Sequence, residues 1–419
     1  MKKNNLFNRV YDTVAIMFFI VATCSFFACS KDDDTPPYIS PYAENRTVMV
    51  YMVAENSLSS NALTDVQEML VGMNNDTLNV NDRLVIYLDD VKLPRIYVVD
   101  KTTKKTLLSD LIPVVTYEED VNSASAEQLG AFVDYVKTHY PAESYGLVMW
   151  SHASGWVPST YNGDRSGGVS AVRKTFGVDN GKNISNKYNG NNGHQMEIVD
   201  MAKALEGESF DFIFFDACVM QTIEVAYELR HLANYLIASP AEIPAPGANY
   251  KTMVKAMFSK DDCVNQMMTD YEHEYRDSYG LVISAVNTSA LDDYATYMKS
   301  VVAAHRSEMM GLDTSSMLNY IHYGTWTTMY PDFLDLQGIM LKVLDGEEYA
   351  QWKAETDKVV TCLHAGCWYS AYLKGKVTID DAQCCGMSMF IPFEKYAYNS
   401  WAFNDNYLKT SWAKAVWIE

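Results

Sequence analysis

Cys218 and His152 are the two residues of this chain whose types and surroundings could together do chemistry. Each follows a short apolar run, residues 210–215 before the cysteine and residues 147–150 before the histidine. Such runs predict strands buried on both faces of a parallel sheet, whose carboxyl ends lie along one edge. A thiolate beside an imidazole can attack an amide carbonyl and then protonate the leaving amine. We therefore predict a catalytic pair, although a buried structural cysteine or a capping histidine explains each residue taken alone.

The residues around this pair predict the rest of a hydrolytic site. Apolar residues at helical spacing, beginning with Val219 and Ile223, predict a helix that starts almost directly after Cys218. The positive end of that helix would lower the pKa of the thiol. We expect the backbone N–H groups of Cys218 and of Ala153, next to the histidine, to hold the oxyanion.

The two motifs resemble those of a known peptidase family. Segments 150–156 (WSHASGW) and 214–230 (FFDACVMQTIEVAYELR) are similar to the His and Cys motifs of the clostripain-like cysteine peptidases, which have gingipains and caspases as more distant relatives. The resemblance runs from about Arg46 to the C-terminus, and segments 47–56, 236–242, 333–336 and 386–392 also look like family segments. It implies an α/β fold, namely a caspase-like α/β/α sandwich with a mostly parallel central sheet and a more helical C-terminal subdomain.

The resemblance also implies cleavage after Arg or Lys, with carboxylates that pair with the substrate cation. Asp216, two residues before the nucleophile, matches the acidic position of the motif. A second acid is expected in the following turn, where this chain has Pro246 instead, so the specificity could be relaxed. Glu242 or Asp179 could take its place in substrate binding.

The sequence departs from the family pattern at one more position, and two alternative functions remain open. Ala153 stands where the family has glycine, and a positive φ there would be strained. The chain could instead be a catalytically weak or inactive caspase-like extracellular binding lipoprotein, or a hydrolase that acts on a different amide.

Composition limits the partners and cofactors that we expect. The chain has 419 residues and a formal net charge of −20, which argues against nucleic acid and leaves proteins or peptides as partners. The oligomeric state stays open. We predict no cofactor and no metal site, because the sequence has no EF-hand loop and its cysteine spacings fit no common zinc pattern. Calcium stays possible, since it activates some relatives and the surplus of carboxylates permits it here. A disulfide of Cys362 or Cys367 with Cys384 or Cys385 is conceivable.

The N-terminus predicts export and lipid attachment. Residues 1–28 have the basic start and the short apolar run of a signal peptide, and they end at a Phe-Phe-Ala-Cys sequence typical of a bacterial lipoprotein signal. Cys29 would carry the lipid, and residues 29–45 would form a disordered acidic tether. We therefore expect an outer-membrane lipoprotein in the cell envelope of a Gram-negative bacterium, anchored in the membrane through the lipid. The acidic run also resembles signals for export to the cell surface.

The remaining chain alternates strands and helices. We predict a caspase-like peptidase domain over 46–250 and a mostly helical subdomain over 251–419 that completes the peptidase. Loop 158–195, rich in Gly, Asn, Ser and Lys, lacks apolar periodicity and is predicted to be structureless. In the family this interval commonly contains a site of self-cleavage. The predicted strands are 47–54, 84–88, 95–100, 236–239, 281–286 and 387–391, and the predicted helices are 62–71 and 124–138.

Overall fold

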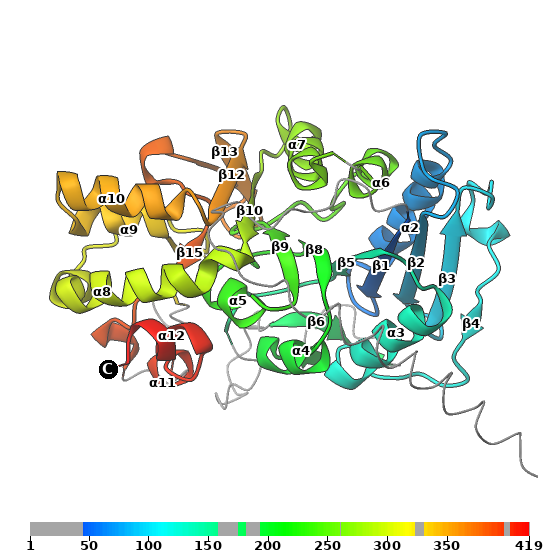
Figure 1. Cartoon of the computed structure of the whole chain (residues 1–419), viewed down its shortest axis with the longest axis horizontal. Coiled ribbons are helices and arrows are strands. Elements are labelled where there is room, and N and C mark those ends of the chain that lie inside the picture. Colours follow the sequence, from blue (N-terminus) through cyan, green and yellow to red (C-terminus); the bar gives the residue numbers. More distant parts are fainter. Residues whose placement is uncertain are drawn as a thin grey trace, which may run out of the picture. The chain divides into compact units, whose positions relative to one another are not determined.

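The chain folds around a nine-stranded sheet (Figure 1). The structure is a computed structural model that describes residues 45–157, 175–181, 193–259, 261–322, 331–397 and 403–418. In their order across the sheet, the strands are β12 (Val360–His364), β10 (Val282–Asn287), β9 (Ala233–Ala238), β8 (Phe210–Asp216), β5 (Ser144–Trp150), β1 (Arg46–Val53), β2 (Arg83–Asp89), β3 (Arg95–Asp100) and β4 (Val115–Thr116). The neighbours from β9 to β2 are parallel, and the strands at both edges pair antiparallel.

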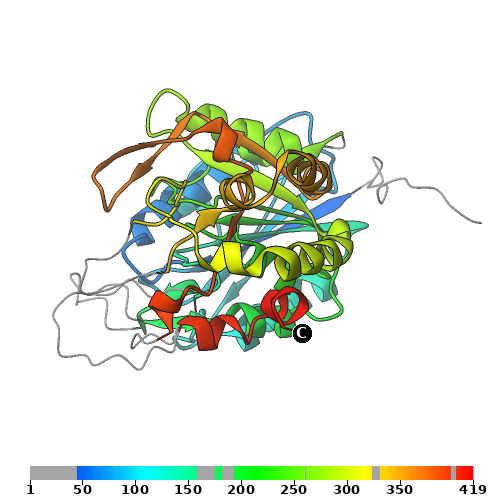
Figure 2. The ribbon, with the colours of Figure 1, turned by 90° about the vertical axis from the view of Figure 1, so that its left-hand side faces the viewer.

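Helices cover both faces of this sheet, as Figure 2 shows with the sheet seen nearly edge on. One layer consists of α2 (Ser59–Met73), α6 (Tyr250–Met257) and α7 (Cys263–Tyr275). The other contains α3 (Ala126–His139), α4 (Ile198–Ala204), α5 (Ile223–Glu228) and α8 (Leu291–Met310). The mostly parallel sheet between two helical layers confirms the predicted fold class.

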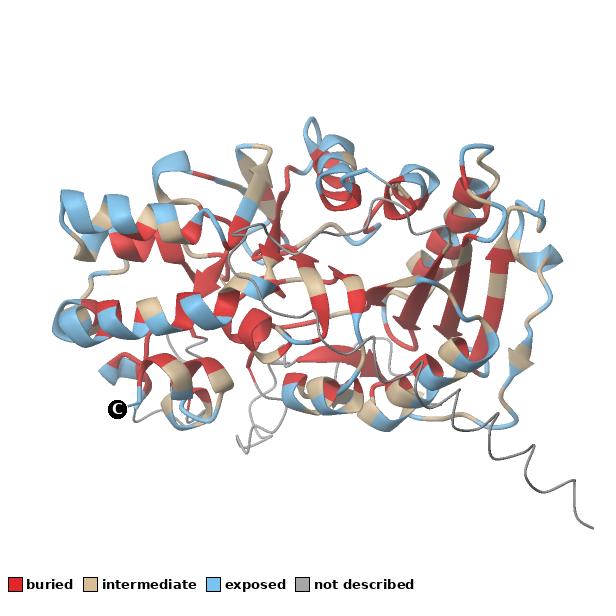
Figure 3. Ribbon diagram, viewed as in Figure 1, coloured by how far each residue is buried: buried red, intermediate tan, exposed pale blue. Residues whose placement is uncertain are grey.

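Strand β1 shows why these residues form a central strand. Its side chains alternate between the two helical layers, with Val48 and Val50 packed on one side and Met49 and Tyr51 on the other. All eight residues of the strand are buried, and in Figure 3 the strands and the inward faces of the helices are the buried parts. A strand covered on both faces favours apolar residues at successive positions, which explains the apolar run over residues 48–53.

The C-terminal part of the chain adds to the same sheet. Strands β10 and β12 extend it beyond β9, and α8 packs against the C-terminal helix α12 (Ser411–Val416). The other elements of this part are α9 (Leu336–Val343), α10 (Gly346–Thr356), α11 (Phe403–Tyr407), and the strand pairs β11 (Leu334–Asp335) with β15 (Ser388–Met389) and β13 (Cys367–Ser370) with β14 (Gly375–Thr378).

Most of the predicted elements occur within a few residues of their expected bounds, but three differ. The helix after Cys218 begins only at Ile223. The predicted strand 387–391 is reduced to the two residues of β15. Within the loop predicted to be structureless, β6 (Phe176–Asp179) and β7 (His194–Met196) form an antiparallel pair. Short strands of this kind depend on a partner distant in sequence, which a local pattern does not reveal.

Several predictions concern residues that the structure does not describe. The signal peptide, the lipidation site Cys29 and the tether as far as residue 44 lie outside the described residues, as do 158–174 and 182–192 of the loop. Among the described helices, none has the length and apolar character needed to cross a bilayer. None of the six cysteines described, Cys218, Cys263, Cys362, Cys367, Cys384 and Cys385, is in a disulfide.

Candidate active site

His152 and Cys218 lie at the ends of two neighbouring strands. In the register of β5 with β8, Trp150 is paired with Asp216, and each candidate catalytic residue comes two positions later in its own chain segment. Both residues line one cleft of about 590 Å³, and both are partly exposed. The parallel pairing therefore brings together the two motifs that the sequence predicted to meet.

Cys218 sits in a tight turn rather than at the start of a helix. The next residue, Val219, has a φ of 55°, which is unusual for a β-branched residue, and its N–H donates to the carbonyl of Ala241. Helix α5 starts five residues after the cysteine, so the predicted effect of a helix dipole on the thiol does not apply. Instead, the N–H of Ile243 donates to the sulfur at 3.4 Å, and the sulfur lies 3.9 Å from the carbonyl oxygen of the same residue.

His152 is held by a residue that sequence reasoning missed. The Nε2 atom of its ring lies 2.8 Å from the hydroxyl oxygen of Ser57, which belongs to the turn between β1 and α2. Asn56 shapes that turn, because its side-chain amide donates to the carbonyls of Val53 and Val178. The backbone carbonyl of His152 in turn accepts from the N–H of Gly177.

The backbone after His152 is ordered by β6. Ala153 forms a bridge with Phe176, and the N–H of Ser154 donates to the carbonyl of Thr175. The φ of Ala153 is not positive, so the exchange of glycine for alanine causes no backbone strain here. The glycine that does need a positive φ is Gly155, at 68°, where a Cβ atom would lie 2.9 Å from the carbonyl oxygen of Val219.

The cleft is built from several parts of the chain. Its lining contains the two candidate catalytic residues and Asp216, Glu242, the turn 243–247, Leu58, and the aromatic residues Trp150, Tyr279, Tyr369 and Tyr372. Tyr369 and Tyr372 come from the β13–β14 hairpin, so the C-terminal part of the chain closes one side of the cleft. A second hollow of about 770 Å³ lies over α3 and α4, but its lining includes no cysteine or histidine.

Asp216 is a buried carboxylate in the lining of the cleft, only 3% exposed. Its Oδ2 atom accepts from the Tyr250 hydroxyl at 2.8 Å and from the Ala248 N–H at 3.1 Å, and Oδ1 accepts from the Tyr271 hydroxyl at 2.7 Å. Burial raises its pKa, while these three donors act in the opposite direction. Such a fixed carboxylate can pair with the cationic side chain of a ligand.

The turn after β9 brings the backbone close to this carboxylate. Gly247 has a φ of 67°, and a Cβ atom there would lie 2.6 Å from Oδ2 of Asp216, so only glycine fits. Pro246 lines the cleft beside it and contributes no charge. A further acid near Asp216 is Asp65 of α2, which the sequence did not suggest as part of the site.

Asp65 accepts a hydrogen bond from the indole N–H of Trp150 at 2.8 Å. Its pKa is raised to about 9, first by burial and then by the charge of Asp216, while the hydrogen bond from Trp150 acts in the opposite direction. Asp65 would therefore be protonated at neutral pH in the absence of a cationic ligand. No signal in the sequence places Asp65 near Asp216, because α2 lies far from both motifs along the chain.

Of the other two candidate acids, Glu242 lies in the cleft and Asp179 lies outside its lining. Glu242 lines the cleft, and its charge opposes the lowering of the His322 pKa that burial causes. Asp179 is not part of the cleft lining. Its carboxylate accepts from the N–H groups of Ser123 and Gly181 and lies near Glu55, which does not support the predicted role of Asp179 in substrate binding.

Known proteins are similar to this chain over most of its length. The model of the Clostripain family matches residues 50–418. Clostripain of Hathewaya histolytica is 29% identical over 224 residues, which are 49% of this chain and 40% of the clostripain sequence, so the chain matches less than half the length of that relative.

Two solved structures are similar over almost the whole chain. One is an inactive zymogen C11 protease from Parabacteroides distasonis, with 28% identity, a TM-score of 0.72, and coverage of 91% of this chain and 99% of that chain. The other is a secreted C11 cysteine protease from Bacteroides thetaiotaomicron in complex with an irreversible peptide inhibitor, with 27% identity, a TM-score of 0.70, and coverage of 88% and 98%. Since the family match extends over most of the sequence, the chain belongs to the clostripain family.

Proposed function

We propose that this chain is a cysteine endopeptidase in which Cys218 is the nucleophile and His152 the general acid and base. The observation that carries the proposal is the placement of both residues at paired strand ends, in one cleft that also contains the buried Asp216. Membership of the clostripain family supports the reaction class. The irreversible peptide inhibitor on the Bacteroides thetaiotaomicron protein supports a peptide substrate for this chain as well.

The reaction would proceed by acyl transfer. The Cys218 thiolate attacks the scissile carbonyl carbon, a sulfur–carbon bond forms, and the carbonyl oxygen becomes an oxyanion that backbone N–H groups such as those of Cys218 and Ala153 can hold. The protonated His152 then gives its proton to the leaving amine as the peptide bond breaks. Water, deprotonated by the same imidazole, hydrolyses the thioester and restores the thiolate.

Ser57 would position the imidazole in this scheme. When the Nε2–H of His152 donates to the Ser57 hydroxyl, the neutral ring carries no proton on Nδ1, which is then the nitrogen that acts as the base. The proposed role of Ser57 is therefore to select the tautomer and the ring orientation, as the third member of a catalytic triad does elsewhere.

Substrates with Arg or Lys before the scissile bond fit the proposed site best. The cationic side chain would reach Asp216, whose carboxylate already has three fixed donors and still has acceptor capacity left. Pro246 adds no second charge to the lining, so we propose a preference for basic residues that is weaker than two carboxylates would provide.

Cleavage of peptide substrates tests the peptidase function directly. Cys218→Ala and His152→Ala should each reduce cleavage of a fluorogenic Arg or Lys peptide by several orders of magnitude, with little change in the circular dichroism spectrum. A peptide electrophile carrying Arg should label the wild-type chain at Cys218 and leave Cys218→Ala unlabelled. Cys263→Ala, which removes a buried cysteine outside the cleft, is the matched control. Wild-type turnover by Cys218→Ala would refute the mechanism.

The assay should include chain that has been cut in the 158–195 interval as well as intact chain. The Parabacteroides distasonis relative is an inactive zymogen, and we propose that this chain can also require cleavage to become active. Incubation of wild type and Cys218→Ala side by side distinguishes self-cleavage, which only the wild type would show, from cutting by a contaminating protease.

We also propose that the mature protein is an outer-membrane lipoprotein that begins at Cys29. The basic start, short apolar run and Phe-Phe-Ala-Cys sequence of residues 1–29 support this location. Mass spectrometry of the protein from membranes should find an acylated N-terminal Cys29, and Cys29→Ser should release the chain from the membrane fraction. An unmodified mature N-terminus at another residue would contradict the proposal.

A further inference from the structure

Two thiols that the proposed peptidase mechanism does not use lie together at the β12 edge of the sheet. Cys362 is the third residue of β12, and Cys384 comes shortly before the strand β15. The two thiols are hydrogen-bonded to each other, and both residues are partly buried. Both are free cysteines in the structure.

The segment that contains Cys384 lies directly against Cys362. On β12, Cys362 pairs with Ser284 of β10, and the Ser284 hydroxyl donates to the carbonyl of Gly386 at 2.6 Å. Gly386 has a φ of 78°, and a Cβ atom there would lie 2.8 Å from the Cβ atom of Cys362. The backbone on the two sides of the thiol pair is therefore in close contact and held by a buried hydrogen bond.

Asp335 and Tyr320 fix the position of Cys384. The Asp335 carboxylate accepts from the N–H of Cys385 at 3.0 Å and from the N–H of Gly386 at 2.9 Å. The Tyr320 hydroxyl donates to the same carboxylate at 2.7 Å and lies 3.4 Å from the sulfur of Cys384. Because both thiols are held on ordered segments, joining them would cost little further conformational entropy.

The other cysteines of this region are engaged elsewhere. The thiol of Cys385 is buried and donates to the carbonyl of Met387 at 3.7 Å. Cys367 lies at the start of β13, where a Cβ atom added to Gly280 would be 2.7 Å from its sulfur. Of the four pairings that the sequence left open, the structure therefore favours Cys362 with Cys384.

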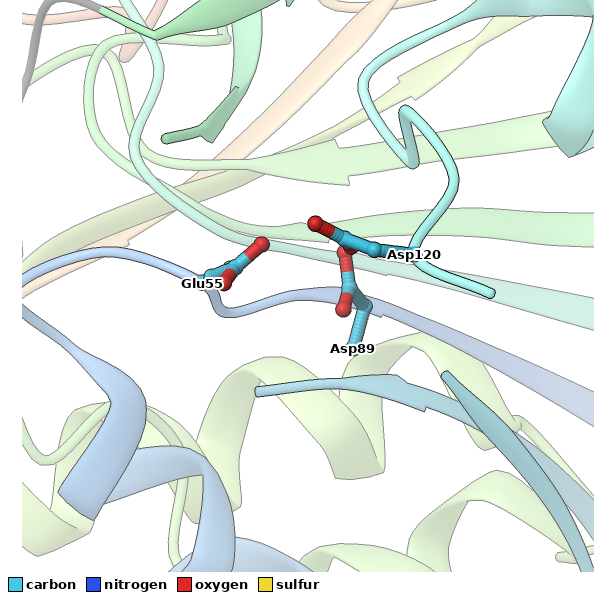
Figure 4. A group of neighbouring side chains, drawn as sticks. All are labelled: Glu55, Asp89 and Asp120. Atoms are coloured by element: carbon cyan, nitrogen blue, oxygen red, sulfur yellow. The ribbon is translucent and has the colours of Figure 1, made fainter. Parts of the chain in front are cut away.

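The two thiols do not belong to a larger set of metal ligands. Over the parts of the chain that the structure describes, one group of three His, Cys, Asp or Glu side chains has its ligand atoms within 4.8 Å of one another, namely Glu55, Asp89 and Asp120. Figure 4 shows that group, which lies elsewhere in the fold and contains no sulfur. A close pair of thiols without further ligands suits a two-electron oxidation better than zinc, which takes four ligands.

We propose that Cys362 and Cys384 are a site of oxidative modification, where a low-molecular-weight disulfide converts the two thiols into a disulfide bond. The proposed location in the cell envelope is a compartment in which such a bond persists.

The oxidation is a thiol–disulfide exchange in two steps. The Cys384 thiolate attacks one sulfur of glutathione disulfide, a mixed disulfide forms, and one glutathione leaves as a thiolate. The Cys362 thiol loses its proton to solvent and attacks the sulfur of Cys384, so that the new S–S bond forms and the second glutathione leaves. In total the two protein thiols lose two electrons and two protons, and the oxidant is reduced to two thiols.

The order of the two steps follows from the surroundings of Cys362. The hydrogen bond with Cys384 and then burial raise the pKa of the Cys362 thiol well above its ordinary value. Because the thiolate is the nucleophile, Cys362 is the poorer choice for the first, bimolecular attack. Its own attack comes second, on a sulfur that already lies beside it.

The disulfide would join two segments on which the cleft depends. Strand β12 leads into the β13–β14 hairpin, which lines the cleft with Tyr369. Four residues after Cys384, the N–H of Ser388 donates to the carbonyl of Gln221, in the turn after Cys218. A bond that closes a loop of about 20 residues would hold these segments together. Its effect on the cleft rests on the proposed peptidase function, whereas the oxidation does not.

The test uses the full chain with Cys218→Ala, so that the proposed nucleophile neither reacts with the oxidant nor cuts the chain. The protein is treated with glutathione disulfide, its remaining thiols are blocked, and it is digested with trypsin for mass spectrometry. Trypsin places Cys362 in peptide 359–374 and Cys384 in peptide 377–395. We expect these two peptides to be linked after oxidation and to separate after reduction.

Four variants assign the bond, because each peptide contains a second cysteine. Cys362→Ala and Cys384→Ala should abolish the link between the peptides, whereas the matched controls Cys367→Ala and Cys385→Ala should keep it. Oxidation should also raise the midpoint of thermal unfolding by a few degrees in the parent and in Cys367→Ala. The same treatment should leave the midpoint of Cys384→Ala unchanged.

Three outcomes would overturn the proposal. These are linked peptides in Cys362→Ala or Cys384→Ala, two separate peptides in the oxidised parent, and a bond within peptide 377–395. If Cys362→Ala does not fold, Cys384→Ala, at a position outside the nine-stranded sheet, decides the question in the same way. Because all readouts are made without the nucleophile, a failed peptidase assay would not affect them.

Discussion

At the scale of single residues, the contact between Ser57 and His152 is the most informative. The hydroxyl lies 2.8 Å from Nε2, and it comes from a turn that the sequence connects with no catalytic motif. Ser57 is exposed, so its loss should not disturb the core. Its proposed function is to orient the imidazole, and this role can be separated experimentally from a structural one.

Ser57→Ala should lower kcat about 3- to 10-fold and leave KM nearly unchanged, because one hydrogen bond worth about 0.5–1.5 kcal/mol is lost from the catalytic step. Ser57→Thr, which keeps the hydroxyl, should restore most of kcat. The pH dependence of kcat/KM should also change, since the bond to Ser57 affects the protonation of the imidazole. Ser60→Ala, an exposed serine of α2, is the control. A change in KM alone, or a threonine variant as slow as the alanine variant, would argue against a positioning role.

At the scale of elements, the turn after β9 determines what the base of the cleft can bind. Gly247 allows the backbone to approach Asp216, and the Tyr275 hydroxyl donates to the carbonyl of Gly247. Pro246, in the same turn, lines the cleft. If basic substrates bind as proposed, the charge that they meet depends on the residue that this turn places beside Asp216.

Pro246→Asp should raise the preference for Arg or Lys over uncharged residues by roughly ten- to a hundredfold, because a second carboxylate adds charge-assisted hydrogen bonds of about 1.5–3 kcal/mol each. The measurement is kcat/KM for a peptide library varied at the residue before the scissile bond. Leu373→Asp adds the same charge at an exposed position outside the cleft lining and should have little effect. Strict basic specificity in the wild type, unchanged by Pro246→Asp, would mean that another acid such as Asp65 already supplies the second charge.

At the scale of the whole molecule, the C-terminal segment is hydrogen-bonded to α5, the helix that follows Cys218. The carboxylate of Glu224 in α5 accepts from the N–H of Phe390, 166 positions further along the chain, at 2.9 Å. Glu224 is 2% exposed, and burial raises its pKa to about 7, while the bond from Phe390 opposes the shift. The folded state therefore binds a proton more tightly at this carboxyl than the unfolded chain does.

This raised pKa predicts a pH dependence of stability. Between the ordinary pKa of 4.5 and the folded value of about 7, the folded state holds more protons, so stability at this site falls as the pH rises and then levels off. The total loss is about 3 kcal/mol. Glu224→Gln keeps an acceptor for Phe390 without the charge, so its stability relative to the wild type should rise by about that amount from pH 4.5 to pH 7.

Urea unfolding in the Cys218→Ala background measures this difference at several pH values without self-cleavage. Glu206→Gln, at an exposed position near the end of α4, is the control and should show no such trend. A difference between Glu224→Gln and its parent that does not vary with pH would show that the carboxyl is not buried in solution as it is in the structure.

The sequence by itself determined the strands and the chemistry at their ends. The unbroken apolar runs before His152 and Cys218 predict buried parallel strands, because a strand covered on both faces has no polar side to reveal. Two such runs, each followed by a residue of suitable chemistry, were enough to predict that Cys218 and His152 lie at one edge of a sheet. Asp216 was predicted on a different ground, because it matches the acidic position of the family motif.

Only the tertiary structure decided what surrounds this pair. The helix after Cys218 begins at Ile223 because residues 219–221 pair with the backbone after β9 instead of continuing the helical pattern. Ser57 and Asp65 reach the site from segments whose neighbours depend on the order of strands in the sheet. Local periodicity distinguishes a strand from a helix but contains no record of which strands will be adjacent, or of the register in which they pair. Contacts between distant segments follow from that order and register, so they appear only in the folded chain.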